Sequence, residues 1–405
     1  VPWSRLVSYQ KGYPQMLKTA ALAAMAAVIP YVLSPVHTVN IESFPLGVLE
    51  RNTLLDGAEH LFQGDVVGPE AFTVEEDGSL ITGLADGRIV RISSTEDGGV
   101  LSTTLARTGV NDSECGSSIE LEPRCGRPLG MHLDPLNPNK LFIVDGYKGF
   151  LEMDLKTNQI TTLATHTEDG SPLVLPNSVL PSSDGLIIYI TDTSVTYQRR
   201  RIFHAAFSGI PTGRLLAYHR SNGSISIIRE GLLMPNGMAH DYHRKCFLIA
   251  LTISREVKRY CPHDNTLTTF AKGLPGTLDN IVRYSDPYTH ERGFLLGIGS
   301  KVAKPFSLLT AIAPFPSLRR WLCGLPLPYT WLYKLIPKHG ILGVLDTDGN
   351  LVTTLQDPTG YTSWVSEGVV SNGSLWLGSW LSPHLTRVPF GKTSPARLNV
   401  VNALR

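Results

Sequence analysis

The sequence predicts an all-β protein, a six-bladed β-propeller, and three observations support this fold class. A unit of turn, short apolar strand, second turn and alternating strand recurs about six times. Successive units begin roughly 45 to 60 residues apart, the length of a four-stranded blade. Long helical periodicity is nearly absent between the units. Because one blade cannot cover both faces of its own sheet, the units are expected to close into a ring.

The clearest unit is residues 75–92, EEDGSLITGLADGRIVRI, in which two Asp-Gly turns flank a hairpin strand. The others follow along the chain as NKLFIVDGYKGFLEMDL, GLIIYITD with GRLLAYHRSNGSISII, KCFLIALTISREVKRY, RGFLLGIGS with GILGVLDTDGNLVTTL, and NGSLWLGSWLSPHLTRVPF. A β-sandwich would have simpler hairpin spacing and would not repeat so evenly. The propeller is therefore assigned to residues 46–390, with a C-terminal tail at 391–405.

The N-terminal segment differs from the rest, because residues 19–33, TAALAAMAAVIPYVL, contain no charge. A spanning helix requires about 20 apolar residues, a length that the run approaches when residues 34–36 extend it. Positive charges before the run favour a cytoplasmic tail at 1–18 and a propeller on the other side of the membrane. We interpret 19–36 as an uncleaved signal anchor of a single-pass type II membrane protein, with the propeller in the lumen of the secretory pathway or outside the cell. A cleaved secretory signal and a buried Ala-rich helix are the alternatives.

Acceptor sequences for N-glycosylation also indicate the secretory pathway. They occur at Asn111 (NDS), Asn222 (NGS) and Asn372 (NGS), each beside turn-forming residues that could accommodate a glycan. The sequence therefore predicts a glycoprotein.

The five cysteines are consistent with an oxidising compartment. Cys115 and Cys125 lie in a polar, Gly-containing stretch, where a local disulfide is expected. Cys246 and Cys261 could pair across neighbouring strands, which would leave Cys323 unpaired.

Charge excludes one class of partner. The chain has 36 Lys+Arg against 35 Asp+Glu, and no basic cluster is large enough to attract a polyanion. Nucleic acid is therefore not expected as a partner.

The segment 301–340 interrupts the fifth unit and is aromatic, Pro-broken and basic. We interpret it as a cap or lid insertion. Plain packing against the rim of a blade and contact with a membrane are the alternatives.

Oxygen-bearing side chains recur at one relative position in the units. The innermost strand of a blade lines the central channel and lies about 8 to 15 residues before each hairpin strand. At that offset five of the six units supply Glu70, Asn177, Asn236, Asp279 and Glu367, whereas the second supplies only RPLGMHLD. Turn chemistry alone would not select the same position in separate blades.

Carboxylates and amides that meet in a channel require a partner, because an unpaired buried charge is unfavourable. A hard cation supplies one. Oxygen ligands without His or Cys favour Ca²⁺ over zinc, and magnesium is disfavoured because it resists dehydration. The alternative is that these side chains only satisfy backbone groups at the mouth of the channel.

Several motifs resemble the strictosidine synthase-like family of six-bladed propellers, and specifically a membrane-anchored branch of it. In chain order they are GPEAF, CGRPLGM, VDGYKGF, LPNSV, YITDTSVTYQRRR, GIPTGRLLAY, MPNGMAH, LDNIVR and SEGVVSNGSLWLGSW. The resemblance extends from about Leu46 to Phe390, nearly the whole predicted propeller. It implies a calcium-dependent hydrolase of the arylesterase or lactonase type, with an ancestry shared with gluconolactonases and paraoxonases.

The same resemblance implies roles for individual residues. The implied calcium ligands are Glu70, Asn177, Asn236 and Asp279. Asp279 has a second candidate role as general base. Glu367 lies where the alkaloid-forming enzymes of the family carry their catalytic glutamate. It is a candidate acid or base, and the alternative is that it only completes the polar lining of the channel. Ser178 and Leu278 replace residues that are common beside these ligands in the family, which affects the surroundings of the ligands rather than the ligands themselves.

Two other functions remain as alternatives. A non-catalytic cell-surface binding or adhesion protein with a structural calcium would have a protein or glycan partner. A synthase that condenses an amine with an aldehyde is disfavoured by the anchor and the calcium ligands. For the hydrolase, the expected partners are a small-molecule ester or lactone and, through the anchor, a membrane.

Overall fold

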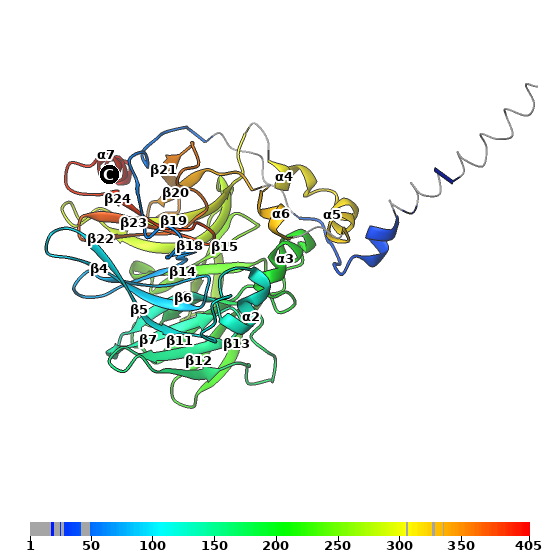
Figure 1. The fold of residues 1–405 in the computed structure, drawn as a ribbon, viewed down its shortest axis with the longest axis horizontal. Helices are drawn as coiled ribbons and strands as arrows, with labels where there is room; N and C mark the ends of the chain where they lie inside the picture. The colour runs from blue at the N-terminus through cyan, green and yellow to red at the C-terminus, as the bar shows by residue number, and fades with distance from the viewer. Residues whose placement is uncertain are drawn as a thin grey trace, which may run out of the picture.

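The strands of the computed structural model form six four-stranded antiparallel sheets, which confirms the six-bladed propeller. The structure describes residues 18–19, 25, 28–41, 49–304, 307–325, 329–334 and 336–405. The first strands of successive blades contact one another, so the sheets follow each other around a central channel (Figure 1). The first three blades are β2 (Phe72–Val74), β3 (Leu80–Gly83), β4 (Arg88–Ser94) and β5 (Val100–Arg107); β6 (Pro128–Asp134), β7 (Asn137–Asp145), β8 (Gly149–Asp154) and β9 (Ile160–Ala164); and β10 (Pro176–Pro181), β11 (Ile187–Asp192), β12 (Gly213–His219) and β13 (Ser224–Leu232).

The other three blades complete the ring. They are β14 (Pro235–Asp241), β15 (Cys246–Leu251), β16 (Glu256–Cys261) and β17 (Thr266–Ala271); β18 (Gly276–Ser285), β19 (Arg292–Lys301), β20 (Gly340–Leu345) and β21 (Leu351–Asp357); and β22 (Val365–Ser371), β23 (Ser374–Ser379), β24 (Leu385–Pro389) and β1 (Glu59–Leu61).

The sixth blade joins the two ends of the propeller. Its outer strand, β1, precedes the first blade in sequence and pairs antiparallel with β24, with Glu59 opposite Arg387. These two side chains form an ion pair of 2.6 Å. The ring is therefore held closed by backbone hydrogen bonds between its first and last strands.

The hydrophobic core lies between the blades rather than inside any one of them. Ile81 of the first blade packs with Ile143 of the second. Val369 of the sixth blade packs with Phe72 of the first, so the same arrangement continues across the closure. Because each apolar sheet face is covered by the next sheet, the ring explains why the units repeat in the sequence.

Between β1 and β24, the helices of the described residues lie in the connections. A 3-10 helix (Ile119–Leu121) and α2 (Glu122–Cys125) precede the second blade, and a second 3-10 helix (Arg199–Arg201) and α3 (Ile202–Ser208) connect β11 to β12. A third 3-10 helix (Tyr242–Arg244) connects β14 to β15. Between β19 and β20 lie α4 (Leu308–Ile312), α5 (Pro316–Cys323) and α6 (Tyr329–Lys334), which gather beside α3 at one end of the molecule (Figure 1).

The C-terminal tail predicted for 391–405 contains α7 (Pro395–Leu404). Ala396 and Val400 of this helix are buried in the core cluster between the fifth and sixth blades. The end of the chain therefore contributes to the packing of the ring.

The expected disulfide between Cys115 and Cys125 is confirmed, and Cys246 and Cys261, whose pairing the sequence left open, also form one. The second joins β15 to its neighbour β16. Cys323 carries a free, half-buried thiol, and burial raises its pKa to about 12.

Within the described residues, no helix combines the length and apolar character needed to cross a bilayer. Residues 1–17 of the predicted tail, and 20–24 and 26–27 of the predicted anchor, lie outside the described residues. The part of the anchor that is described continuously begins at residue 28 and is helical as far as residue 33.

Candidate functional site

Four of the five predicted oxygen-bearing residues lie at irregularities in the innermost strands. The pairing between the first and second strands of the blade shifts register around Asn177, Asn236, Asp279 and Glu367. Glu70, the fifth, precedes β2 by two residues. A bulge leaves its residue unpaired and redirects its side chain, so the local backbone accounts for polar residues inside otherwise apolar strands.

The second blade supplies no such side chain because the residue at its register shift, between Pro128 and Gly130, is the apolar Leu129. A Cβ on Gly130 would be 2.6 Å from the carbonyl oxygen of Asn177 in the third blade. Only glycine permits this approach. The inner strand of the second blade therefore combines an apolar residue at the bulge with a glycine that lets the next strand approach.

Glu70, Asn177, Asn236 and Asp279 line a single cavity of about 510 Å³, so the structure brings these four predicted residues together. The lining also contains aromatic and aliphatic side chains, among them Phe203 and Phe207 of α3, Ile312 of α4, Tyr333 of α6, and Trp380. The connections within the third and fifth blades thus contribute part of the cavity lining. A volume of this size is typical of small-molecule sites.

Two oxygen atoms in this cavity are buried without a hydrogen-bond partner among the described residues. They are Oδ1 of Asn236 and Oδ1 of Asp279. Burial, followed by the negative charge of Glu70, raises the pKa of Asp279 well above its usual value, and a hydrogen bond from Asn236 only partly offsets this. The protein alone therefore leaves this carboxylate poorly stabilised.

Glu367 occupies a different environment from the other four. Its Oε1 accepts a 2.7 Å hydrogen bond from the backbone N–H of Phe72, and the side chain is not among the described residues that line the cavity. Burial raises the pKa of Glu367 to about 8. The carboxyl group therefore joins the inner strands of the sixth and first blades.

Sequence analysis missed a buried arginine next to Glu70. Nη2 of Arg127 is 2.6 Å from Oε2 of Glu70, and Nη1 donates to the carbonyl of Gly68 at 2.8 Å. The Arg127 side chain is fully buried. The motif CGRPLGM contains this arginine, and a charged residue at the start of an inner strand was the available signal.

A second arginine, Arg199, lines the cavity. It forms an ion pair with Glu122 of α2, whose other carboxylate oxygen accepts from the hydroxyl of Tyr147 at 2.8 Å. Burial opposes the charge of Arg199, yet the carboxylates of Glu122 and Glu70 raise its pKa above the usual range. The motif YITDTSVTYQRRR thus places a permanent positive charge at the site.

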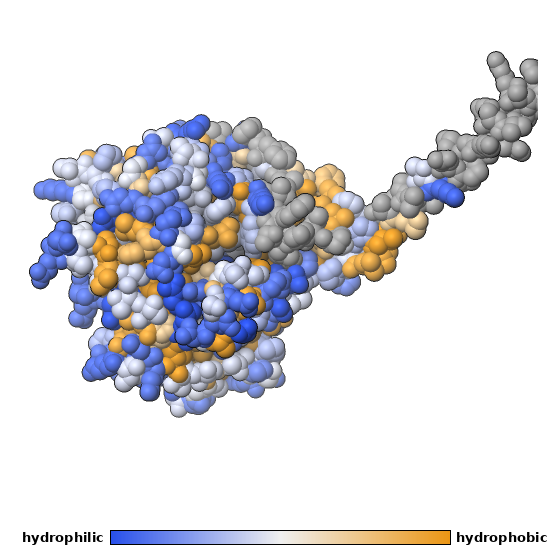
Figure 2. All heavy atoms as spheres, in the orientation of Figure 1, coloured by the Kyte–Doolittle hydropathy of each residue, from blue (hydrophilic) through white to orange (hydrophobic). Residues whose placement is uncertain are grey.

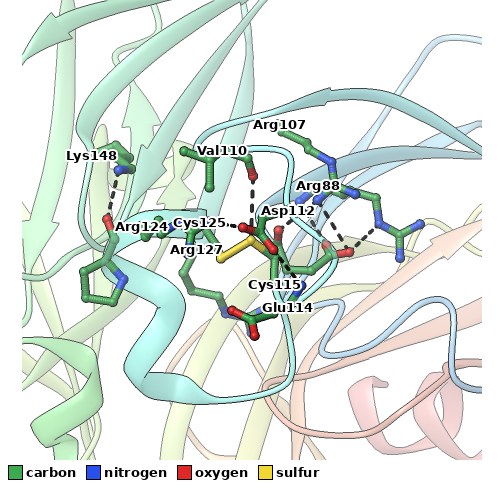
Figure 3. Close-up of a disulfide and its surroundings, with 12 residues drawn as sticks. Arg88, Arg107, Val110, Asp112, Glu114, Cys115, Arg124, Cys125, Arg127 and Lys148 are labelled. Atoms are coloured by element: carbon green, nitrogen blue, oxygen red, sulfur yellow. Dashed lines mark hydrogen bonds and ion pairs between the residues drawn. A yellow bond between two sulfur atoms is a disulfide. The ribbon is translucent and has the colours of Figure 1, made fainter.

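The disulfide between Cys115 and Cys125 lies beside Arg127 (Figure 3). Cys125 ends α2 and precedes Arg127 by two residues. Lys148 from the second blade donates to the carbonyl of Pro123 at 2.9 Å and holds the same helix from the other side. This arrangement fixes the backbone that positions Arg127 and Glu122.

The predicted glycosylation sites lie away from the cavity lining. Asn111, Asn222 and Asn372 are all exposed, as an acceptor asparagine must be. Glycosylation itself stays a prediction.

The architecture defines a class, a six-bladed propeller whose inner strands present oxygen atoms to a central cavity. The chain belongs to the strictosidine synthase-like family: its sequence matches the models described as "Strictosidine synthase-like, N-terminal" over residues 47–92 and "Strictosidine synthase" over residues 179–265. It is 34% identical over 349 residues to adipocyte plasma membrane-associated protein of Gallus gallus, covering 84% of this chain and 80% of that protein. The hemomucin of Drosophila melanogaster is 28% identical over 88% of this chain and 64% of its own length. The resemblance seen in the sequence motifs is therefore confirmed.

Solved structures show the same fold at low sequence identity. A gluconolactonase from Xanthomonas campestris superposes with a TM-score of 0.53 at 15% identity, covering 88% of this chain and 98% of that one. A luciferin-regenerating enzyme superposes with a TM-score of 0.52 at 10% identity, covering 82% of this chain and 94% of that one.

Proposed function

We propose that this protein is a calcium-dependent hydrolase of carboxylic esters or lactones, of the arylesterase type. The observation that carries the proposal is the pair of buried, unpartnered oxygen atoms, Asn236 Oδ1 and Asp279 Oδ1, in a cavity large enough for a small molecule. Such atoms persist in a folded protein when a ligand satisfies them.

The residues fit a hard cation. Glu70, Asn177, Asn236 and Asp279 offer carboxylate and amide oxygens only, the donor type that calcium prefers. These four residues would hold the ion. When bound, the ion would supply positive charge for the oxygen of an ester or lactone carbonyl as negative charge develops on it.

Asp279 is the proposed general base. Its carboxylate would accept a proton from a water molecule as the water oxygen bonds to the acyl carbon. The bond from the acyl carbon to the alkoxy oxygen then breaks, and that oxygen takes up the proton held by Asp279 and leaves as an alcohol, which returns Asp279 to the carboxylate. A lactone would open to the hydroxy acid by the same bond changes.

The other cavity residues would bind and orient the substrate. The aromatic and aliphatic side chains of α3, α4 and α6 suit the organic part of an ester and would exclude bulk water. Arg199 adds fixed positive charge beside the polar residues. The role of Glu367 as an acid or base stays a prediction, and its hydrogen bond to Phe72 also suits a role in holding the strand that follows Glu70.

The comparisons with known proteins support two parts of this proposal, the hydrolytic reaction and the location at a membrane. A gluconolactonase shares the fold, and the curated relatives are named as plasma membrane-associated. We propose a membrane or cell-surface location, with residues 19–36 as the anchor, the propeller outside the cytoplasm, and 301–340 as a cap on the cavity. Glycans at the three exposed acceptor sites would be compatible with this placement.

The test is hydrolysis of phenyl acetate and a panel of small lactones by the purified full chain, with calcium and with EGTA. Activity that disappears on chelation and in Asp279→Ala, while circular dichroism retains the β-sheet signal, supports the proposal. If no ester or lactone is hydrolysed although calcium raises the melting temperature, the calcium is structural. The non-catalytic binding protein would then be the better interpretation.

A further inference from the structure

The end of the molecule that carries the helices exposes large apolar side chains (Figure 2). Phe315, just before α5, is 57% exposed, and Leu318 within α5 is 42% exposed. The adjacent N-terminal helix is apolar on all sides and exposes Val28, Ile29, Val32 and Leu33. In water such a helix would be covered by other protein, and within the described residues these four side chains stay exposed.

The N-terminal segment is attached to this end of the propeller rather than being a free tether. The backbone N–H of Val39 donates to Ser208 of α3 at 2.9 Å, and Thr38 Oγ1 donates to the carbonyl of Pro316 at 2.9 Å. The buried guanidinium of Arg319 donates to the carbonyls of Val39 and Phe207. The N-terminal segment, α3 and α5 therefore move as one body.

An aromatic contact joins the N-terminal helix itself to α5. The guanidinium of Arg320 lies 4.6 Å from the ring centroid of Tyr31. A Cβ on Gly324 would lie 1.6 Å from the carbonyl oxygen of Pro30, so glycine allows the two backbones to touch. The apolar residues of the N-terminal helix and of α5 thus form one surface.

The segment 301–340, which contains α4, α5 and α6, carries basic but no acidic residues. Residues 301–340 contain six Lys and Arg residues and no Asp or Glu. The remainder of the chain has 30 basic residues against 35 acidic ones. Arg319 is buried and Lys301 lines the cavity, so the positive charge on the outside of this segment comes from Lys304, Arg320, Lys334 and Lys338. Apolar side chains beside such residues match a bilayer that contains anionic lipids.

We propose that α5 lies flat on a lipid bilayer of net negative charge, beside the point where the N-terminal helix enters that bilayer, with Phe315 and Leu318 inserted among the headgroups. The surface comprises the N-terminal helix at residues 28–33 and α5. Because α3 and α4, which line the cavity, pack against α5, the cavity then adjoins the lipid. This placement does not depend on hydrolytic activity, and it differs from a propeller that hangs from a single tether.

The test measures the depth of single labelled positions in vesicles. Full-length protein with Cys323→Ser is reconstituted in phosphatidylcholine and phosphatidylserine vesicles, with or without brominated phospholipid, and keeps both disulfides because no reductant is used. A thiol-reactive fluorophore is placed at Phe315→Cys or, in a second protein, at Leu318→Cys. The matched control is Leu186→Cys, because Leu186 is 56% exposed and lies before β11, whose other end leads to Thr193 in the cavity.

The proposal predicts about a twofold or greater loss of emission from both α5 labels with brominated lipid, and no loss from the control label. Replacing phosphatidylserine with neutral lipid should weaken the quenching, since the charge contribution is lost. Labels at Phe315 and Leu318 that are quenched no more than the label at Leu186 would overturn the proposal. A second copy of the protein could cover this surface instead of lipid. Labels that are shielded from water without being quenched by brominated lipid, and more so at higher protein density in the vesicles, would indicate that copy and overturn the proposal.

Discussion

Arg127 and Glu70 form a buried ion pair between the first two blades, with Nη2 of the arginine 2.6 Å from Oε2 of the carboxylate. The ion pair directs one carboxylate oxygen of Glu70 toward Arg127, and Glu70 also lines the cavity. It thereby fixes the orientation of a proposed calcium ligand.

Arg127→Met should destabilise the protein by about 3–5 kcal/mol in EGTA, because it leaves the carboxylate of Glu70 buried and unpaired. Denaturant unfolding measures this loss. Arg387→Met is the matched control, since its ion pair with Glu59 is largely exposed and worth about 0–1 kcal/mol. Equal losses in the two variants would contradict the importance assigned to the buried pair.

Asp279→Asn should change stability in opposite directions with and without calcium. In EGTA the variant should be more stable than the wild type by about 1–3 kcal/mol, because an unpartnered buried carboxylate is removed. The folded-state pKa of Asp279 is raised, so the wild type in EGTA should lose stability as pH rises from the unfolded pKa through the folded one. Thermal unfolding across pH measures both effects. In calcium the order should reverse, and a variant that is less stable under both conditions would contradict the account.

Glu367→Gln should retain ester hydrolysis within about threefold of the wild type, because glutamine can still accept the hydrogen bond from Phe72. Glu367→Ala, which removes the acceptor, should lower stability by about 1–3 kcal/mol. Steady-state kinetics of Glu367→Gln across pH measure the first effect, and denaturant unfolding of Glu367→Ala measures the second. A kcat that falls by orders of magnitude in Glu367→Gln, without loss of stability, would establish Glu367 as an acid or base in the reaction.

The two disulfides should contribute similar stability but differ in their effect on the site. They span sequence separations of 10 and 15 residues, and replacing either pair by serine should cost about 2–3 kcal/mol. Only the pair of Cys115 and Cys125 lies beside Arg127 (Figure 3). Calcium affinity measured by calorimetry should therefore fall in Cys115→Ser/Cys125→Ser and stay unchanged in Cys246→Ser/Cys261→Ser. Equal affinities in both variants would show that the loop does not position the site.

His384 should make the protein sensitive to acid. It is buried and stacks on His60 with ring centroids 3.5 Å apart, and neither of its ring nitrogens has a partner among the described residues. Burial, and then the charge of His60, lowers the pKa of His384 to about 4. As pH falls, the unfolded state takes up a proton at this histidine before the folded state does. The contribution of neutral His384 to the free energy of unfolding should therefore be fully present above about pH 6.5 and decrease toward pH 4, by at most about 3 kcal/mol.

His384→Phe keeps an aromatic ring in the stack and should reduce this acid sensitivity, which thermal unfolding between pH 4 and 7.5 would detect. His263→Phe, at an exposed position, is the control. If both variants lose stability with acid as steeply as the wild type does, His384 is not the cause.

The fold and part of the site could be predicted from the sequence. Periodic turns and strands indicated the blades, and a common offset identified Glu70, Asn177, Asn236 and Asp279, which do line one cavity. That inference works because equivalent positions in repeated units lie at equivalent places around the ring.

The offset could not separate Glu367 from the ligands, because a bulge also occurs there while the side chain turns to the Phe72 backbone. Nor could it identify Arg127 and Arg199 as neighbours of the site. Their ion pairs join different blades and a connection, and such contacts depend on the assembled ring.

The central claim is that Glu70, Asn177, Asn236 and Asp279 hold one calcium ion. Calcium bound per chain, measured by equilibrium dialysis of the purified protein against buffered free calcium, tests it most directly. The account predicts one ion per wild-type chain, and loss of that ion in both Asp279→Ala and Asn236→Ala at the same free concentration. An absence of bound calcium in the folded wild type, or binding that persists in both variants, would contradict it.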